Sequence, residues 1–473
     1  MAEPFPDTPF FRGNYAPIGI ECDAPDLPVR GTIPPALRGT LFRNGPNPQY
    51  APRDPKAHHW FLGDGMLHAF RIRDGRVAYR NRWVRTPRWQ AEHAAGRALF
   101  GAMGNPMAAD LSVRGVDSGV ANTSVVWHAG RLLALEEAHR PFEVDPATLE
   151  SLGYRDFGGA LAVPRFTAHP KLDPETGQML FFAYGLGGPL GAGMAYGAVD
   201  AAGRLTRCDA FDAPYAAMVH DFLVTRRHVL FPVLPLTGSL KRAMAGGPAF
   251  AWEPEAGAFV GILRRGDPIG ALRWFQGDPC YVFHVMNAWE EGETILADVM
   301  QSRAAPLFPR ADGTWSTDPA EGAARLHRWR FDLGAGTDCF TATPLDDLPG
   351  EFPRIDERFA GLPNRIGFFA AGTRPNPGAA FDSLVRIEPG TGTRRLFTVP
   401  PGDAVSEPVF VPRAPDAPEG EGWLLAVAFR GEEQRSDLLV LDAADPAAGP
   451  VAVAMLPHRV PHGFHGAWRA EAA

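Results

Sequence analysis

The chain has little of what marks several common classes of protein. Only four of its 473 residues are cysteine, namely Cys22, Cys208, Cys280 and Cys339, and no two of them form a C-x-x-C pair. This spacing excludes a zinc ribbon and argues against a disulfide framework. The sequence also has no run of about 18 apolar residues, roughly the length that spans a bilayer, so we expect no membrane-spanning helix.

Basic charge and recognisable signals are scarce as well. The 46 Lys and Arg residues are outnumbered by 54 Asp and Glu, the formal net charge is −8, and the arginines are scattered. A nucleic-acid surface normally needs a basic stripe, so we expect no nucleic-acid partner. The segment MAEPFPDTPFF has neither the basic nor the apolar region of a signal peptide, which leads us to expect a cytoplasmic location. No dinucleotide-binding or P-loop motif is visible, so no organic cofactor is expected.

Helical patterns are few, and short apolar runs separated by Gly, Pro, Asn and Asp dominate the sequence. Only residues 89–100 and 239–244 have a helix-compatible composition. Residues 67–84, LHAFRIRDGRVAYRNRWV, place an Asp-Gly turn between two alternating runs, which is a strong hairpin signal. Similar units begin near Ser124, Arg165, His220 and Trp423. Repeated hairpins with no dividing linker predict one all-β domain over residues 1–473, built as a β-propeller with diverged blades.

Four histidines stand in apolar runs that we expect to be strands: His169 in RFTAHPKLD, His220 in YAAMVHDF, His284 in CYVFHVMNAW and His465 in VPHGFHGAW. Imidazole is the commonest metal ligand, and four of them would suit a borderline metal such as Fe, Cu or Zn. They are far apart in sequence, so they can meet only if the fold returns to one axis. A single histidine of this kind is more often a hydrogen-bonded core residue. Four of them favour a metal centre, and the core interpretation stays open.

Seven motifs run in order along nearly the whole chain, from about Phe10 to Trp468: LRGTLFRNGPNPQY, HHWFLGDGMLHAFRI, ANTSVVWHAGRLLALEE, HVMNAWEEG, GEFPRID, SEPVFVPR and VPHGFHGAW. Together they resemble the carotenoid cleavage oxygenase family, in its bacterial branch. The resemblance implies a seven-bladed β-propeller with a helical and loop dome over one face. It also implies one Fe(II) on the propeller axis, with O2 as co-substrate. The implied ligands are His169, His220, His284 and His465.

The resemblance also assigns roles around the metal. Three glutamates, Glu137 in LLALEE, Glu351 in GEFPRID and Glu407 in SEPVFVPR, would accept the free N–H of ligating imidazoles. A carboxylate in that position fixes the tautomer and the orientation of the ring. Thr123 in ANTS would direct its methyl group at an open coordination position. The plainer interpretations are solvated turn carboxylates for the glutamates and ordinary β-propensity for the threonine.

The implied activity is that of an Fe(II)-dependent dioxygenase, which cleaves a C=C bond with O2 to give two carbonyl products. Residues 82–106 resemble the lignostilbene-cleaving branch, which recognises a phenol with a Tyr and a Lys. Here those positions are Met103 and Glu136, and a carboxylate would repel a phenolate. We therefore expect an apolar conjugated alkene such as a carotenoid or apocarotenoid, which suits a Met-lined tunnel. Phe61 and Phe308 are candidate pocket walls, though each could equally be core.

Other interpretations stay open. The substrate could be a stilbene or a phenylpropene, as in lignostilbene-type enzymes. From a different class, the protein could be a non-catalytic β-propeller scaffold whose histidines hold no metal. The apolar, Gly-rich segments Gly185–Gly197 and Leu234–Trp252 could form a lip where substrate enters and where the protein touches a membrane peripherally, or they could be plain surface loops. Beyond the small-molecule alkene, no protein partner is implied.

Overall fold

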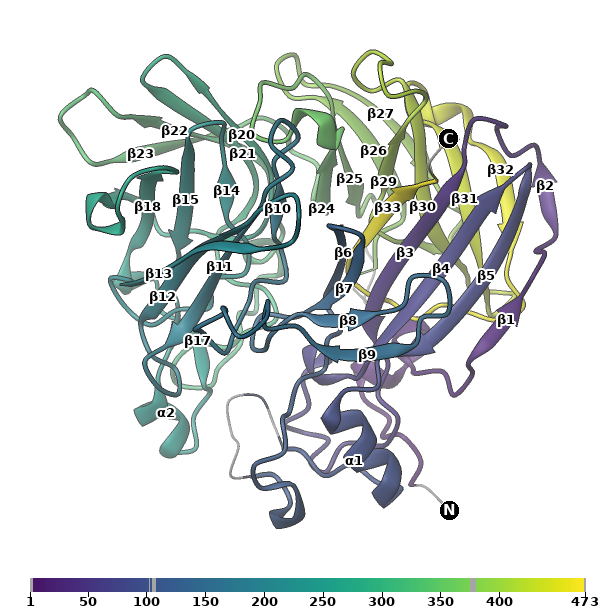
Figure 1. The fold of residues 1–473 in the computed structure, drawn as a ribbon, viewed down its shortest axis with the longest axis horizontal. Helices are drawn as coiled ribbons and strands as arrows, with labels where there is room; N and C mark the ends of the chain where they lie inside the picture. The colour runs from purple at the N-terminus through teal and green to yellow at the C-terminus, as the bar shows by residue number, and fades with distance from the viewer. Residues whose placement is uncertain (1–2, 102, 104–107, 375–379, 472–473) are drawn as a thin grey trace. The chain divides into compact units, whose positions relative to one another are not determined.

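The computed structural model describes residues 3–101, 103, 108–374 and 380–471, and antiparallel strands are their main regular elements (Figure 1). Within these residues the only α-helices are α1 (Pro87–Ala95) and α2 (Leu240–Met244). No helix in this part of the chain is long and apolar enough to cross a membrane. The chain divides into two compact units: unit 1 comprises residues 1–156, 372–386 and 395–473, and unit 2 comprises residues 157–371 and 387–394.

Among its described residues, unit 1 contains three antiparallel sheets. The first has the order β1-β5-β4-β3-β33 and comprises β1 (Cys22–Ala24), β3 (Gly39–Pro46), β4 (Gly65–Arg73), β5 (Arg76–Trp83) and β33 (Gly466–Ala470). The second comprises β6 (Ser124–His128), β7 (Arg131–Leu135), β8 (Phe142–Val144) and β9 (Ser151–Tyr154) in that order. The third has the order β2-β32-β31-β30-β28, with β29 also paired to β30, and comprises β2 (Val29–Gly31), β28 (Ala404–Val405), β29 (Val409–Pro412), β30 (Gly422–Arg430), β31 (Arg435–Asp442) and β32 (Pro450–Met455).

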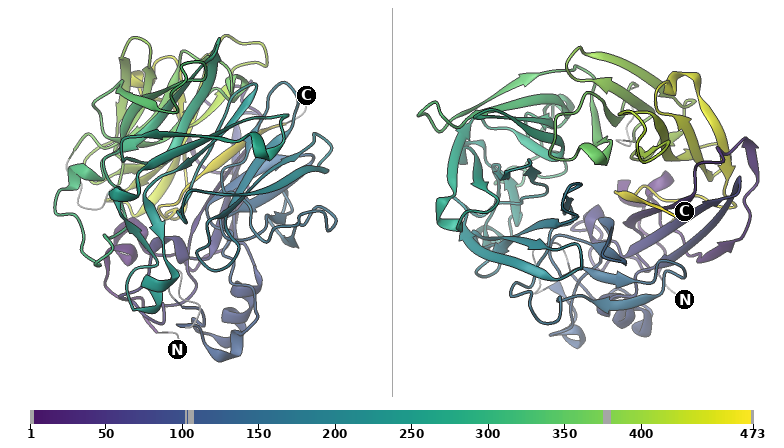
Figure 2. Two further views of the ribbon diagram at one scale, coloured as in Figure 1. Left: turned by 90° about the vertical axis from the view of Figure 1, so that its left-hand side faces the viewer. Right: turned by 45° about the horizontal axis from the view of Figure 1, so that its top comes forward.

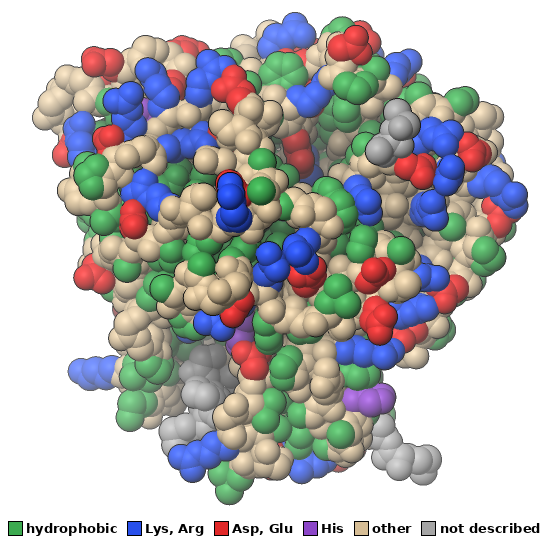
Figure 3. All heavy atoms as spheres, in the orientation of Figure 1, with side chains coloured by type: hydrophobic (Ala, Val, Ile, Leu, Met, Phe, Trp, Pro, Cys, Tyr) green, Lys and Arg blue, Asp and Glu red, His purple; other side chains and the backbone are tan. Residues whose placement is uncertain are grey.

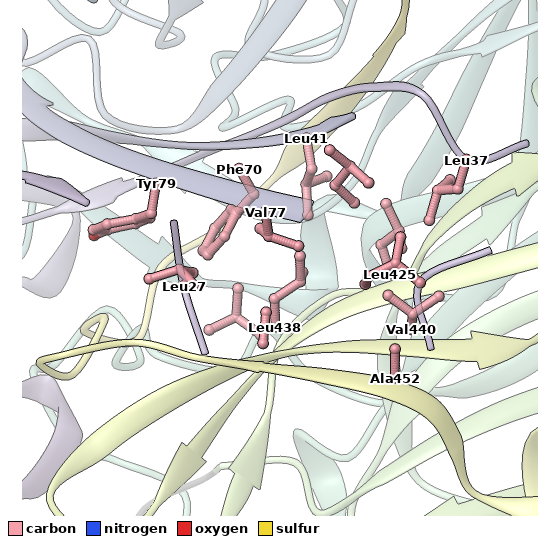
Figure 4. Close-up of a cluster of buried hydrophobic side chains, with 14 of the residues drawn as sticks. Leu27, Leu37, Leu41, Phe70, Val77, Tyr79, Leu425, Leu438, Val440 and Ala452 are labelled. Carbon is pink, nitrogen blue, oxygen red and sulfur yellow. The ribbon is translucent and has the colours of Figure 1, made fainter. Parts of the chain in front are cut away.

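Strands from the two ends of the chain pair with each other in unit 1, where the yellow and purple strands meet in Figure 2. β33 pairs with β3, placing Trp468 opposite Leu41, and β32 pairs with β2. Side chains of these two sheets form a buried core cluster (Figure 4). Phe70, Val77 and Leu438 in this cluster are 0% exposed. Because burying such a side chain contributes roughly 1.5–3 kcal/mol, this core holds the N-terminal and C-terminal strands together.

Unit 2 contains three four-stranded antiparallel sheets that follow one another along its described residues. The first comprises β10 (Lys171–Leu172), β11 (Met179–Leu186), β12 (Gly193–Val199) and β13 (Leu205–Asp212). The second comprises β14 (Leu223–Val224), β15 (His228–Val233), β18 (Ala258–Arg264) and β19 (Arg273–Gly277). The third comprises β20 (Tyr281–Glu291), β21 (Thr294–Ser302), β22 (Arg325–Asp332) and β23 (Phe340–Pro344).

A further four-stranded sheet comprises β24 (Gly350–Ile355), β25 (Gly367–Ala371), β26 (Ser383–Glu388) and β27 (Thr393–Thr398). Over the described part of the chain there are thus seven sheets of four to six strands, and one small sheet of two strands. Each large sheet is the size of one propeller blade. The predicted fold class, an all-β seven-bladed propeller, is confirmed.

Local signals in the sequence have local outcomes in the structure. The predicted Asp-Gly hairpin joins β4 to β5, with Asp74 and Gly75 at φ values of 51° and 76°, as a type I′ turn requires. The helix predicted over residues 89–100 is α1, which begins earlier because the Thr86 side chain caps the N–H of Trp89. It also ends earlier than predicted, because Gly96 adopts the left-handed conformation that terminates helices.

The two Gly-rich segments expected to be a substrate lip or plain surface loops are partly regular. Residues 193–197 belong to β12, and in the second segment β16 (Leu236–Gly238) pairs with β17 (Phe250–Trp252) on either side of α2. Backbone pairing of this kind satisfies N–H and C=O groups that a free loop would leave to water.

On the face shown in Figure 3, acidic and basic side chains are interspersed. Membrane contact through these segments stays a prediction.

Candidate metal centre

Three histidines of unit 2 bring their Nε2 atoms together. The distance is 3.0 Å between Nε2 of His169 and Nε2 of His220, and 3.1 Å between Nε2 of His220 and Nε2 of His284. His220 and His284 are buried, at 7% and 9% exposure, and His169 is half-buried. The three imidazoles contact one another edge to face or tilted, with ring centroids 4.6–5.2 Å apart.

The prediction that these histidines lie within strands holds only for His284, which belongs to β20. His169 comes two residues before β10 and His220 three residues before β14, while in unit 1 His465 immediately precedes β33. The register of β20 shifts on both sides of Val285, next to His284. A side chain before a strand or at such an irregularity is free of the strict alternation of strand faces. This freedom allows the three rings of unit 2, one within a sheet and two just before other sheets, to turn toward one another.

Glu351 holds the far side of the His284 ring. Oε2 of Glu351 lies 2.5 Å from Nδ1 of His284 and accepts the backbone N–H of Phe352 at 2.8 Å. The Phe352 ring is stacked on the imidazole, with centroids 5.3 Å apart and an interplanar angle of 29°. Because a carboxylate accepts the proton at Nδ1, the Nε2 atom of a neutral His284 keeps its lone pair, and that atom faces the other two histidines.

The same arrangement occurs in unit 1 around His465. Oε1 of Glu407 lies 2.9 Å from Nδ1 of His465, and Oε2 accepts the N–H of Gly466 at 2.7 Å. Both side chains are buried, at 4% and 6% exposure for Glu407 and His465. Burial lowers the pKa of the nearby Arg43 to about 10, against the opposing effect of the Glu407 charge. The Glu407 carboxylate therefore stands in a buried setting with a cation to balance it.

The donor set fits a metal ion. A neutral Nε2 atom is either a donor or an acceptor, so the contacts of His220 Nε2 with two other Nε2 atoms, at 3.0 and 3.1 Å, compete for a single N–H. A cation that accepts three lone pairs removes this conflict, and imidazole nitrogen suits the borderline metals Fe, Cu and Zn. The histidine group can therefore bind a metal ion.

Two other residues assigned by resemblance lie in unit 1. The Thr123 hydroxyl donates to Oδ1 of Asn122 at 3.0 Å, and the Thr123 carbonyl accepts the backbone N–H of His465 at 3.2 Å. Asn122 is 1% exposed and donates to the carbonyls of Phe61 and Gly63. Asn122 was not among the predicted site residues, although its place inside ANTS was a signal. Glu137 is half-buried, two residues after β7.

The expected substrate-contacting residues have varied surroundings. The ring of Phe61 lies 5.5 Å from that of Phe464, the neighbour of His465, in an edge-to-face contact. Phe308 is 8% exposed, with its ring 6.4 Å from that of Phe250 in unit 2. Met103 is half-buried in a turn.

Glu136 is 8% exposed and its carboxylate is held by the backbone. Its Oε1 accepts the N–H groups of Val120 and Ala121 at 2.6 and 3.1 Å, and Nδ1 of His139 lies 3.1 Å away. Burial alone would raise the pKa of Glu136, but His139 and the two N–H groups outweigh it, so the pKa is lower than usual. Glu136 is therefore a buried carboxylate anion.

The fold and this centre define a class: a β-propeller with a histidine group that could hold a metal ion and with carboxylates against two of its imidazoles. The family model described as retinal pigment epithelial membrane protein matches residues 15–470. A curated relative, isoeugenol monooxygenase from Pseudomonas putida, is 42% identical over 473 residues, and the match covers 98% of this chain and 98% of the relative. The chain belongs to this family, the carotenoid cleavage oxygenases predicted from the motifs.

Solved structures agree with this assignment. The structure of Pseudomonas brassicacearum lignostilbene dioxygenase matches with a TM-score of 0.95 and 38% identity, covering 99% of this chain and 100% of that one. The structure of cobalt-substituted Synechocystis ACO, an apocarotenoid oxygenase, matches with a TM-score of 0.82 and 28% identity, covering 96% and 97%. The protein is thus an alkene-cleaving oxygenase that acts on a small-molecule alkene, and the scaffold interpretation is set aside.

Proposed function

We propose that this protein is an Fe(II)-dependent dioxygenase that cleaves the propenyl double bond of a phenylpropene with O2, giving two carbonyl products. The convergence of three Nε2 atoms in unit 2 carries the metal part of the proposal. The whole-length similarity to isoeugenol monooxygenase carries the substrate part. The oxygenase domain proposed here comprises residues 1–473, because the family match covers nearly all of them.

His169, His220, His284 and His465 are the proposed iron ligands. His465 enters this set through the family motif and through its Nδ1 contact with Glu407, which parallels that of His284 with Glu351. Glu137 is assigned the corresponding role for a third imidazole by the motif LLALEE. A relative, Synechocystis ACO, has been solved in a cobalt-substituted form, which supports a metal in this family.

Bound ferrous iron would supply O2 activation, leading to the addition of both oxygen atoms across the alkene and its scission into two carbonyls. The protein's own residues prepare the site. Glu351 and Glu407 retain the Nδ1 protons of His284 and His465, so that Nε2 is available as a ligand atom. Thr123 holds the backbone of His465 through its carbonyl and is proposed to place its methyl group beside an open coordination position.

Glu136 and Met103 stand where the lignostilbene branch has Lys and Tyr, which argues against recognition of a phenolate. A phenylpropene is an aryl alkene short enough to need no polyene tunnel, and isoeugenol belongs to this class. Phe61, Met103, Glu136 and Phe308 are the proposed residues around it. Because a buried carboxylate anion would repel a phenolate, the neutral form of such a substrate is the one expected to bind.

The experiment measures iron and substrate preference together. Protein purified without oxygen and loaded with Fe(II) should hold one iron, and His220→Ala should lower that content and abolish turnover. Values of kcat/KM are then compared for isoeugenol, its O-methyl ether, a hydroxystilbene and an apocarotenoid. We expect the highest value for a phenylpropene, with the free phenol favoured over its ether by less than about a hundredfold, about 2.7 kcal/mol. A larger preference for the free phenol would indicate that the enzyme recognises the hydroxyl group. A protein that takes up no iron would refute the metal proposal.

An apocarotenoid, the substrate expected first from the sequence, is the second candidate. The similarity to the Synechocystis apocarotenoid oxygenase structures favours it. In the same panel, a kcat/KM for the apocarotenoid above that of every phenylpropene would select this candidate. We also propose a cytoplasmic location, because all four cysteines are free, as is usual in a reducing compartment.

A further inference from the structure

One buried carboxylate in unit 2 bonds to three residues, and each of these residues is close in the sequence to a different histidine. Asp221, which directly follows His220, is 3% exposed. Its Oδ1 lies 2.7 Å from Nζ of Lys171 and accepts the N–H of Phe222 at 2.8 Å. Its Oδ2 accepts the N–H of Val285 at 3.1 Å. These three donors occupy both oxygens of the carboxylate.

The donors belong to the three segments that carry His169, His220 and His284. Lys171 begins β10 two residues after His169, Phe222 stands two residues after His220, and Val285 follows His284 in β20. The strands concerned, β10, β14 and β20, start three different sheets and are labelled in Figure 1. Asp221 is thus bonded to all three ligand-bearing segments at once.

The contact with Val285 lies at an irregular place in its strand. Pairing of β20 with β21 shifts register between Val282 and Val285 and again between Val285 and Asn287. A strand at such a bulge is bent locally, and its side chains are re-aimed. The Asp221 carboxylate accepts the backbone N–H at this point of the strand, directly after His284.

We propose that Asp221 is a positioning residue for the metal centre: it fixes the placement of His169, His220 and His284 relative to one another. The inference rests on the proposed metal-binding function and deepens it. Metal centres need their ligands held within fractions of an ångström by surrounding hydrogen bonds. A carboxylate can accept all three donors, whereas an amide in its place would turn an N–H toward one of them. Lys171 balances the buried charge, with its Nζ also 6.0 Å from the Phe222 ring centroid.

A purely structural ion pair is the competing explanation, and the same unit offers a matched control. Asp298 is 1% exposed and its two oxygens accept Nε and Nη2 of Arg328 at 2.7 and 2.9 Å. This pair joins β21 to β22. Removing one charge from either buried pair should destabilise the fold to a similar extent. Asp298 lies opposite Asn287 of β20, but its carboxylate bonds to Arg328 on β22, whereas the Asp221 carboxylate bonds to the segments that carry the histidines.

The test titrates Co(II) into the metal-free, full-length protein and records both the Kd and the visible d–d absorption. Asp221→Asn should raise the Kd about 10–100-fold, the usual effect of losing a partner that orients ligands, and should change the d–d bands. Asp298→Asn should leave both unchanged. Urea unfolding of each metal-free variant measures the stability loss separately.

Each outcome decides the matter. Wild-type affinity and bands in Asp221→Asn, or an equal loss of affinity in Asp298→Asn, would overturn the positioning role while leaving the metal site intact. If Asp221→Asn does not fold, Lys171→Met replaces it, since it keeps the carboxylate and both backbone contacts. That variant should weaken Co(II) binding to a smaller extent, and unchanged binding would overturn the proposal. A wild-type protein that binds no Co(II) would instead refute the proposed function itself.

Discussion

At the scale of single residues, the Nδ1 atoms of His284 and His465 each face a glutamate oxygen, at 2.5 and 2.9 Å. In both cases the same carboxylate also accepts a backbone N–H, from Phe352 or Gly466. The main chain therefore fixes each glutamate, and the glutamate in turn fixes the orientation of one imidazole ring. This double attachment distinguishes Glu351 and Glu407 from solvated turn carboxylates, the plainer interpretation that their sequence context allowed.

Removing Glu351 should weaken the metal site more than it weakens the fold. We expect Glu351→Ala to lower metal affinity or activity 10–100-fold. Glu351→Gln should be milder, because its amide oxygen can still accept the Nδ1 proton. Iron content and kcat of both variants check this, with Glu357→Gln as a control, since the Glu357 side chain is 65% exposed. Equal iron content and turnover in wild type and Glu351→Ala would show that Glu351 has no role at the centre.

At the scale of elements, three of the four histidines stand just before a strand, and the fourth stands beside a register shift. The strands are rigid, but side chains within them alternate between the two faces of the sheet. Side chains at strand ends are free of this alternation and can therefore point in other directions. The Asp-Gly turn after β4 and the end of α1 at Gly96 are also set by single residues, because each depends on residues that tolerate positive φ.

The core between the first and third sheets of unit 1 should dominate the stability of that unit. Leu438 on β31 is 0% exposed within this cluster. Leu438→Ala removes buried apolar surface and leaves a cavity, so we expect a loss of about 2–5 kcal/mol in the free energy of unfolding. Urea denaturation measures it, and Leu152→Ala, at a side chain 58% exposed, should change it by less than about 0.5 kcal/mol. A loss for Leu438→Ala no larger than for the control would contradict this account of the core.

At the scale of the whole molecule, the family and its reaction class follow from similarity that extends over nearly all of the chain. In the proposed dioxygenase reaction, one alkene and one O2 give two carbonyl products, and each product receives one oxygen atom of the O2. Turnover under ¹⁸O2 should therefore label both products. Mass spectrometry at short reaction times, before carbonyl exchange with water, provides the measurement. Label in only one product would indicate a monooxygenase, the word in the name of the Pseudomonas putida relative.

The sequence by itself determined the all-β class and the family, and it singled out the residues that are proposed for the metal centre. Hairpin turns, strand alternation and the quoted motifs are local patterns, and each is set by a few neighbouring residues. His169, His220, His284 and His465 could be selected in this way because they stand inside such motifs. The ends of α1 were less well predicted, since a side-chain cap and one left-handed glycine decided them.

Only the tertiary structure decided which atoms meet. The Nε2 contacts join residues 51 and 64 positions apart, and the Asp221 carboxylate reaches Val285 across 64 positions. Asp221 and Lys171 were visible as charges beside histidines in apolar runs, but nothing local showed that they pair. Pairing of β3 with β33 likewise joins opposite ends of the sequence. Such contacts arise because distant strands share sheets and cores, and no local pattern of residues specifies which strands those are.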